Sequence, residues 1–159
     1  SARCASTARC GMASSISSVV AAASAGLLVE KRWLPSWLLY DARGCALYEE
    51  ITRLPEYYLT RAEAEIFERQ GDAIVTLARG AGERLSFTEL GAGTSTKTEA
   101  LLEAVLRAQG SSIYLACDIS EAPLLEGAAR IRRNLPQVRV QTFVGTHLEA
   151  GPAIAACRR

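Results

Sequence analysis

One short stretch of the sequence combines residue types that could hold an anionic or nucleotide-like ligand. Gly91 and Gly93 follow an apolar run at residues 85–90 and precede a stretch with the pattern of a helix. Glycine lets the chain turn tightly and lets a ligand approach the backbone where a Cβ would block it. The free N–H groups at the start of a helix suit a carboxylate or a phosphate. An ordinary turn between a strand and a helix is the alternative interpretation.

Two acidic residues near this turn narrow the choice of ligand. A dinucleotide fingerprint needs a third glycine where Thr96 stands, which disfavours a nicotinamide-dependent enzyme. The Gly-Lys-Ser/Thr of a P-loop is also absent from the turn. Glu89 before the glycines and Asp118 at the end of the next expected strand form the arrangement of Rossmann-like domains that bind S-adenosylmethionine. In such a site the glycine turn passes the methionine part and the second acid binds the ribose hydroxyls, whereas a plain turn at Asp118 is the alternative.

Alternating strands and helices must position these residues. Apolar periodicity predicts three strands separated by two helices, in the order 85–90, 98–109, 112–117, 120–134 and 138–144. This order predicts an α/β fold in which parallel strands are joined by right-handed crossovers. The ligand is then expected at the carboxyl ends of the strands. Side-chain N-caps are expected at the two helices, from Ser120 and from one of Thr94, Ser95 and Thr96.

Helix signals dominate upstream of this unit. Thr60 and Glu63 have the spacing of a capping box, which predicts a helix from Arg61. Gly71 is expected to break this helix, and its inward face is expected to hold Ala64, Phe67, Ile74 and Leu77. Residues 34–44 are predicted to form a packed loop, and residues 46–52 one or two helical turns. Residues 16–29 are predicted to form a short Ala-rich helix ending near residue 31.

Composition bounds the remaining function classes. The chain has 159 residues, enough for one domain, and a net charge of +1 that argues against nucleic acid as a partner. Five scattered cysteines and a single histidine make a zinc site or a disulfide framework unexpected, and they favour a reducing, cytoplasmic compartment. Residues 1–24 contain no acid and are rich in Ser and Ala, which fits either an organellar presequence or a disordered extension. The apolar run at 16–29 is too interrupted for a membrane span.

Three motifs together resemble the histidine-specific methyltransferase family. The first is Tyr40-Asp41-x-Arg43-Gly44, followed by Glu50-Ile51-Thr52-x-Leu54-Pro55-Glu56-Tyr57-Tyr58-x-Thr60-Arg61-x-Glu63. The others are Glu89-Leu90-Gly91-x-Gly93-Thr94-Ser95-x-Lys97-Thr98 and Asp118-Ile119-Ser120. The family includes enzymes that methylate the α-amine of histidine in ergothioneine biosynthesis. The resemblance covers residues 25–149 and implies a Rossmann-like class I methyltransferase core, with residues 25–80 as a helical N-terminal region and residues 81–159 as the first half of the core.

The resemblance also implies roles for individual residues. Gly91, Gly93, Lys97 and Asp118 would contact S-adenosylmethionine, with Lys97 near the methionine carboxylate. Tyr57 would contact the substrate histidine, although packing alone is the plainer role for a tyrosine at that place. No catalytic residue is assigned, because the reference pKa of the attacking α-amine is about 7.7–8.0 and a strong base is not required near neutral pH. No metal ligand is assigned either.

The segment after Gly145 departs from the family pattern. Members typically place Asp-Phe there, against the adenine of the cofactor, and this chain has Thr146-His147. Thr146 could accept from the adenine amino group only through its hydroxyl. His147 could stack on the ring or could be a solvated loop residue.

The resemblance reaches only the first half of the family's length. We therefore expect a fragment, a truncated gene model or a degenerate copy, in which the central strand 85–90 lacks its next neighbour and could drive self-association. The predicted function is a methyltransferase acting on the α-amine of histidine or a related amino acid. The alternatives are a non-catalytic remnant or interaction module, and a relative of the indole-alkaloid N-methyltransferases.

Overall fold

A computed structural model of the protein describes residues 16–157. The elements follow one another in the order α1 (Ile16–Leu27), the 3-10 helix η1 (Ser36–Leu39), α2 (Ala42–Thr52), α3 (Leu59–Arg79), β1 (Phe87–Leu90), α4 (Thr98–Gln109), β2 (Ser112–Asp118), α5 (Glu121–Asn134), β3 (Val138–Val144) and α6 (Gly151–Cys157). The predicted presequence or disordered extension lies mostly outside the described residues. Among those residues, none of the helices has the length and apolar character needed to cross a membrane.

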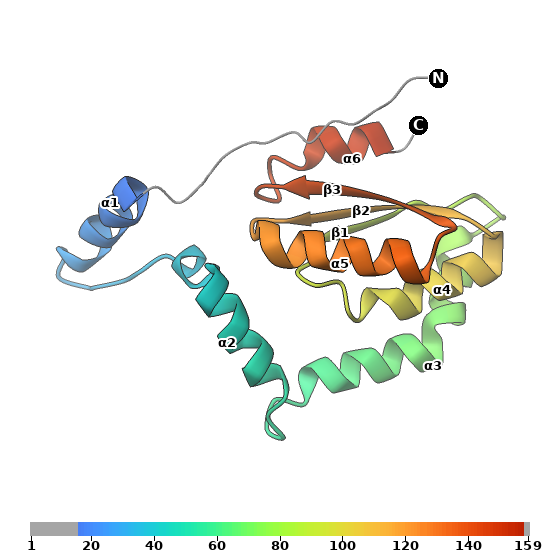
Figure 1. Ribbon diagram of the computed structural model, residues 1–159, viewed down its shortest axis with the longest axis horizontal. Helices are drawn as coiled ribbons and strands as arrows, with labels where there is room; N and C mark the ends of the chain where they lie inside the picture. Colours follow the sequence, from blue (N-terminus) through green and yellow to red (C-terminus); the bar gives the residue numbers. More distant parts are fainter. Residues whose placement is uncertain (1–15, 158–159) are drawn as a thin grey trace.

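The strands form one parallel sheet, as the alternation of strands and helices predicts, and their order across the sheet is β1-β2-β3 (Figure 1). Leu90 pairs with Cys117 at the end of β1, and Asp118 pairs with Val144 at the end of β3. The carboxyl ends of all three strands therefore meet at one edge of the sheet. β1 is an outer strand of this sheet, and Leu90 is 46% exposed.

Helices cover both faces of the sheet. Side chains alternate along β2, so that Tyr114 and Ala116 pack with α4 and α5, while Leu115 and Cys117 pack with α6. The first cluster includes the fully buried Leu102, Leu124 and Ile131. This two-sided burial explains why β2 reads as a nearly continuous apolar run.

α3 forms a further layer outside α4, with the α3 residue Val75 buried against Ala104 and Val105 (Figure 1). The predicted break at Gly71 is wrong, because the helix runs unbroken through that residue and uses its small size to approach α4. A Cβ at Gly71 would lie 3.3 Å from the Cβ of Ala104. Gly71 and Val75, four residues apart, thus define the inward face.

Two further expectations for α3 are corrected by the structure. Ile74 is 38% exposed and Leu77 is 83% exposed, because both lie off the stripe that Gly71 and Val75 set. The helix begins at Leu59, two residues earlier than predicted, and its N-cap Tyr58 makes no side-chain capping bond. The capping box is therefore absent, and the carboxylate of Glu63 instead pairs with Lys97, at the N-cap position of α4.

α1 and α2 lie beyond the sheet edge toward which the β2 and β3 arrows point (Figure 1). The segment predicted to be a packed loop contains η1 and the start of α2, where the Asp41 side chain caps the helix by accepting from the Gly44 N–H at 2.7 Å. Ser120 ties this region to the sheet. Its hydroxyl donates to the Tyr40 carbonyl at 3.2 Å and accepts from the Cys45 thiol at 3.6 Å.

Candidate cofactor site at the carboxyl ends of the strands

The glycine turn follows β1 directly and is held against the end of β2. The N–H groups of Gly91 and Ala92 both donate to the Cys117 carbonyl, at 2.8 and 3.0 Å. Gly91 has φ 77° and Gly93 has φ 49°, in the left-handed region that favours glycine. A Cβ added to Gly93 would meet no atom within 4 Å. Backbone conformation, and not lack of room, therefore requires glycine at position 93, and the space beside it is open.

Asp118 joins the ends of all three strands. Its Oδ2 accepts from the Gly93 N–H and its Oδ1 from the Ser120 N–H, both at 2.8 Å. Its backbone carbonyl accepts from the Gly145 N–H at 2.9 Å. The carboxylate is partly buried and faces the glycine turn. The side chain predicted to bind a ligand thus also fixes the shape of the turn.

The segment after β3 approaches the glycine turn through His147. The imidazole is exposed, and its Nε2 lies 3.8 Å from the position of a Cβ on Gly91. The Thr146 N–H and hydroxyl both donate to Oε2 of Glu149, at 2.8 and 2.7 Å. The Glu149 N–H reaches back to the Thr146 hydroxyl at 3.4 Å. These are the reciprocal bonds of a capping box, and the Thr-x-x-Glu spacing would have revealed Glu149 in the sequence.

Lys97 stands at the N-cap position of α4 and connects the glycine turn to α3. Its ammonium group forms an ion pair with the Glu63 carboxylate, and both side chains remain partly exposed. The predicted caps Thr94, Ser95 and Thr96 are not used, because α4 begins only at Thr98 and has no side-chain capping bond. The hydroxyls of Thr94 and Thr96 instead bond to each other at 2.9 Å. Ser120 does occupy the N-cap position of α5, but its hydroxyl bonds to the N-terminal region instead of the helix.

A buried polar network lies beneath the turn and was not predicted from the sequence. Oε2 of Glu89 accepts from the hydroxyls of Tyr114 at 2.5 Å and Thr98 at 2.7 Å. The Tyr114 hydroxyl also bonds to the Ser95 hydroxyl at 2.8 Å. Burial raises the pKa of Glu89 above its usual value of 4.5, although these two hydrogen bonds act in the opposite direction. Burial likewise raises the pKa of Tyr114, with Glu89 adding to the rise.

α5 packs so closely on the turn that one of its residues must be glycine. A Cβ on Gly127 would lie 2.4 Å from the Thr94 carbonyl oxygen. The same carbonyl accepts from the Arg130 guanidinium at 2.9 Å, and that guanidinium also pairs with Glu99 of α4. The turn is therefore held between α5 on one side and β2 on the other.

Tyr57 lies in the connection between α2 and α3. Its hydroxyl is 3.3 Å from that of Tyr48 on α2, and the two rings meet edge to face with centroids 6.2 Å apart. The hydrogen bond from Tyr57, together with burial, raises the pKa of Tyr48 to about 12. Arg61 fixes the connection by donating to the carbonyls of Leu54 and Pro55, at 3.0 and 2.6 Å. The structure thus places Tyr57 beside Tyr48 of α2, while Glu63 of the following helix, α3, pairs with Lys97.

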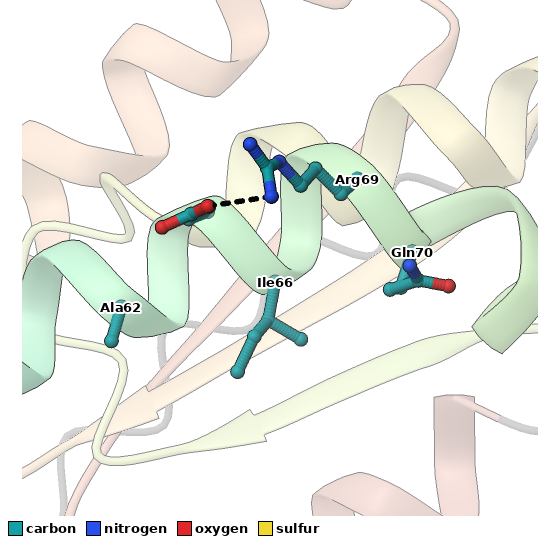
Figure 2. A pocket seen from close by; sticks show the side chains of 5 residues that line it. Ala62, Ile66, Arg69 and Gln70 are labelled. Atoms are coloured by element: carbon teal, nitrogen blue, oxygen red, sulfur yellow. Dashed lines mark ion pairs between the residues drawn. The ribbon is translucent and has the colours of Figure 1, made fainter.

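Two surface hollows accompany α3. One is lined by residues of this single helix, namely Ala62, Glu65, Ile66, Arg69 and Gln70 (Figure 2). None of the predicted site residues lines it, so it does not compete with the glycine turn as a candidate site. The other hollow lies between α3 and the start of α4 and includes Lys97. Within residues 16–157, no group of three or more His, Cys, Asp or Glu side chains is arranged to hold a metal ion.

Comparison with known proteins places the chain among methyltransferases. Residues 19–158 match the model of a family described as histidine-specific, SAM-dependent methyltransferases. A histidine N-alpha-methyltransferase of Mycolicibacterium smegmatis is 37% identical over 121 residues, which is 76% of this chain and 36% of the relative. Ergothioneine biosynthesis protein 1 of Schizosaccharomyces pombe is 36% identical over 70% of this chain and 15% of its own length. An N-methyltransferase of Aspergillus fumigatus, fsqC, is 32% identical over 85% of this chain and 37% of its own length. The chain thus spans little more than a third of these relatives at most.

Proposed function

The chain belongs to the family of S-adenosylmethionine-dependent, histidine-specific methyltransferases, and we propose that it forms the cofactor-binding part of an N-methyltransferase acting on the α-amine of histidine or a related amino acid. The observation that carries the proposal is the position of Asp118. Its carboxylate bonds to Gly93 and its carbonyl to Gly145, so that three loops converge where parallel sheets bind their ligands. Residues 81–159 would form this part, and the helices within residues 25–80 would cover it.

The side chains around the turn fit the polar groups of S-adenosylmethionine. Each Asp118 oxygen accepts one backbone N–H and keeps a further acceptor site, which suits two ribose hydroxyls. The Lys97 ammonium is partly exposed and suits the methionine carboxylate, as do the amides of the turn. The open space beside Gly93 lets a ligand reach the backbone. When bound, the cofactor supplies a methyl group activated on a sulfonium.

The segment after β3 is proposed to contact the adenine. His147 lies beside Gly91 and is exposed, so its ring is available for stacking. The Thr146 hydroxyl donates to Glu149 and accepts from the Glu149 N–H, which leaves its oxygen one acceptor site for an amino group. We expect this contact to be weaker than one made by an aspartate, since a neutral hydroxyl replaces a charged acceptor.

Tyr57 is proposed to orient the amino-acid substrate. The Tyr48 and Tyr57 hydroxyls share one hydrogen bond, which uses one of their two protons and leaves the other to donate to a substrate carboxylate or imidazole. The attacking α-amine has a reference pKa of about 7.7–8.0, so the protein is required to orient it and exclude water and not to deprotonate it strongly.

Calorimetric titration of the purified chain with S-adenosylhomocysteine tests the cofactor part of the proposal. We expect binding by the parent chain, loss of binding by Asp118→Ala, and unchanged binding by the control Asp72→Ala, whose side chain pairs with Arg107 on the helical layer. A folded parent chain that binds nothing would contradict the proposal and favour a non-catalytic remnant. Sedimentation velocity on the same samples would show whether the outer strand β1 drives self-association.

A methylation assay tests the substrate. The chain, and a version extended to the length of its relatives, would be incubated with labelled S-adenosylmethionine and either histidine or tryptophan. Methylation of histidine in preference to tryptophan is expected. Preference for tryptophan would instead support a relative of the indole-alkaloid enzymes, and no transfer by the extended version would contradict the proposed activity.

A further inference from the structure

Ser95 adopts a backbone conformation that residues with a side chain rarely take. Its φ is 55°, and it is the one non-glycine residue with positive φ among residues 16–157. The residue is only 3% exposed, and its N–H donates to the Ala92 carbonyl at 2.7 Å. It lies between Gly93 and Lys97, in the centre of the turn assigned to the cofactor. Something other than local preference must therefore hold Ser95 in place.

Besides the backbone bond to Ala92, the Tyr114 hydroxyl holds Ser95 through its side chain. The Glu89 carboxylate accepts hydrogen bonds, so Tyr114 uses its single proton toward Glu89 at 2.5 Å. The Tyr114 oxygen then accepts from the Ser95 hydroxyl at 2.8 Å. The hydrogen bonds run in one direction, from Ser95 through Tyr114 to Glu89. Tyr114 is fully buried, and its ring packs against that of Phe87 with the ring centroids 5.9 Å apart. The hydroxyl therefore has a fixed position.

The opposite side of the turn is held separately. Thr94 rests on Gly127, and its carbonyl accepts from Arg130. These contacts fix the residue before Ser95 but leave the Ser95 side chain itself to Tyr114. Removing the Tyr114 hydroxyl would therefore release Ser95 without removing the support that α5 gives to Thr94.

We propose that Tyr114 is a positioning residue for cofactor binding, which holds Ser95 in its left-handed conformation so that the turn from Gly91 to Lys97 is already ordered before the cofactor arrives. The inference rests on the proposed function, because it assigns the turn to S-adenosylmethionine. If the turn becomes ordered only when the ligand binds, the free-energy cost of ordering it reduces the free energy of binding, and the affinity is lower. Tyr114 is fully buried and would act on the cofactor only through Ser95.

The first test is Tyr114→Phe in the 159-residue chain, with affinity for S-adenosylhomocysteine measured by calorimetry. The ring and its packing stay, and only the hydroxyl is lost. We expect the affinity to fall by about tenfold, the size of one lost buried hydrogen bond. The matched control is Ser112→Ala, which removes a buried hydroxyl from the opposite end of β2. Its affinity should stay within about twofold of the parent, and an equal fall in the control would overturn the proposal.

A double-mutant cycle separates positioning from general loss of stability. Ser95→Gly removes both the strained side chain and the partner of Tyr114. In that background, Tyr114→Phe should weaken binding by less than about threefold, because the interaction under test is already gone. A purely structural effect of Tyr114→Phe would cost the same affinity in both backgrounds, and that result would overturn the proposal, as would a folded Tyr114→Phe chain that binds like the parent.

Hydrogen exchange tests the positioning role without any ligand. The Ser95 amide should exchange at least about tenfold faster in Tyr114→Phe than in the parent, while the amides of α5 stay unchanged. Unchanged exchange at Ser95 would overturn the positioning role. Absence of binding by the parent chain would instead count against the proposed function, so the two failures are distinguishable.

Discussion

Oδ2 of Asp118 accepts a 2.8 Å hydrogen bond from the backbone N–H of Gly93, which lies twenty-five residues earlier in the chain. The glycine turn after β1 and the acid at the end of β2 are therefore one structural unit. Substitutions at either residue should alter both the shape of the turn and its affinity for a ligand.

Replacing Asp118 should weaken cofactor binding in a graded way. Asp118→Ala removes the acceptors for Gly93 and Ser120 as well as the proposed ribose ligand, and we expect S-adenosylhomocysteine affinity to fall by about a hundredfold. Asp118→Asn keeps one acceptor oxygen, so its affinity for S-adenosylhomocysteine should lie between those of the parent and Asp118→Ala. Isothermal calorimetry at one pH and salt concentration measures both. An Asp118→Ala chain that keeps the parent affinity would remove Asp118 from the site.

Gly93→Ala should reduce both stability and affinity, whereas Gly110→Ala should reduce stability alone. Both glycines have positive φ, 49° and 79°, and neither would place a Cβ within 4 Å of another atom. Each substitution therefore carries the same kind of backbone strain, about 1 kcal/mol. Gly110 ends α4, away from the turn, and is the matched control. Denaturant unfolding measures the stability of each variant, and calorimetry measures its affinity for S-adenosylhomocysteine. Equal losses of affinity in the two variants would contradict a special role for Gly93.

The Lys97 ammonium should pair either with the Glu63 carboxylate or with the carboxylate of the cofactor, so that the two compete. Lys97→Ala should lower S-adenosylhomocysteine affinity by about tenfold, because the only proposed cation for that carboxylate is lost. Glu63→Gln should raise the affinity by up to about threefold by removing the competitor, and less at high salt. The Glu65–Arg69 pair on the same helix supplies the control Glu65→Gln, which should change nothing. A lower affinity in Glu63→Gln would show that the ion pair assists binding.

Glu89 should make the protein less stable as pH rises above 4.5. Burial raises the pKa of the folded Glu89 above that value, with Glu63 adding to the rise and Lys97 opposing it. Between the unfolded and folded pKa values the folded chain binds more protons, so the free energy of unfolding falls with rising pH, by at most about 1.4 kcal/mol per pH unit.

Glu89→Gln should remove this slope. The free energy of unfolding of both chains would be measured in urea between pH 4.5 and 7.5. The difference between the two chains at each pH gives the contribution of Glu89. A difference that does not vary with pH would show that the pKa of Glu89 is not raised.

Local pattern was enough to predict the elements that carry the site. The bounds of β2, β3, α4 and α5 agree with prediction to within one residue, because alternation and helical periodicity are properties of a few neighbouring residues. β1 begins at Phe87, two residues later than predicted. The parallel order follows from the strand–helix alternation. The Gly-x-Gly turn and Asp118 were likewise found from their places at strand ends, and the structure brings them together.

The errors of prediction lie where a distant partner outweighs a local preference. Glu63 has the spacing of a capping box but pairs with Lys97, and Gly71 continues a helix because α4 needs its small surface. A hydroxyl or a carboxylate can bond to any of several local or distant partners, and the spacing of residues in the sequence does not show which partner it takes.

The family, the parallel arrangement of the strands and the glycine turn could all be inferred from the amino-acid sequence, since they depend on local pattern and motif. Three contacts depend instead on how the elements pack: the Tyr114 hydroxyl supports Ser95, Thr94 packs against Gly127, and His147 lies beside Gly91. Each of those contacts joins residues at least nineteen positions apart. Their formation depends on how the layers pack, because burial and hydrogen-bond geometry are fixed only when the strands and helices meet.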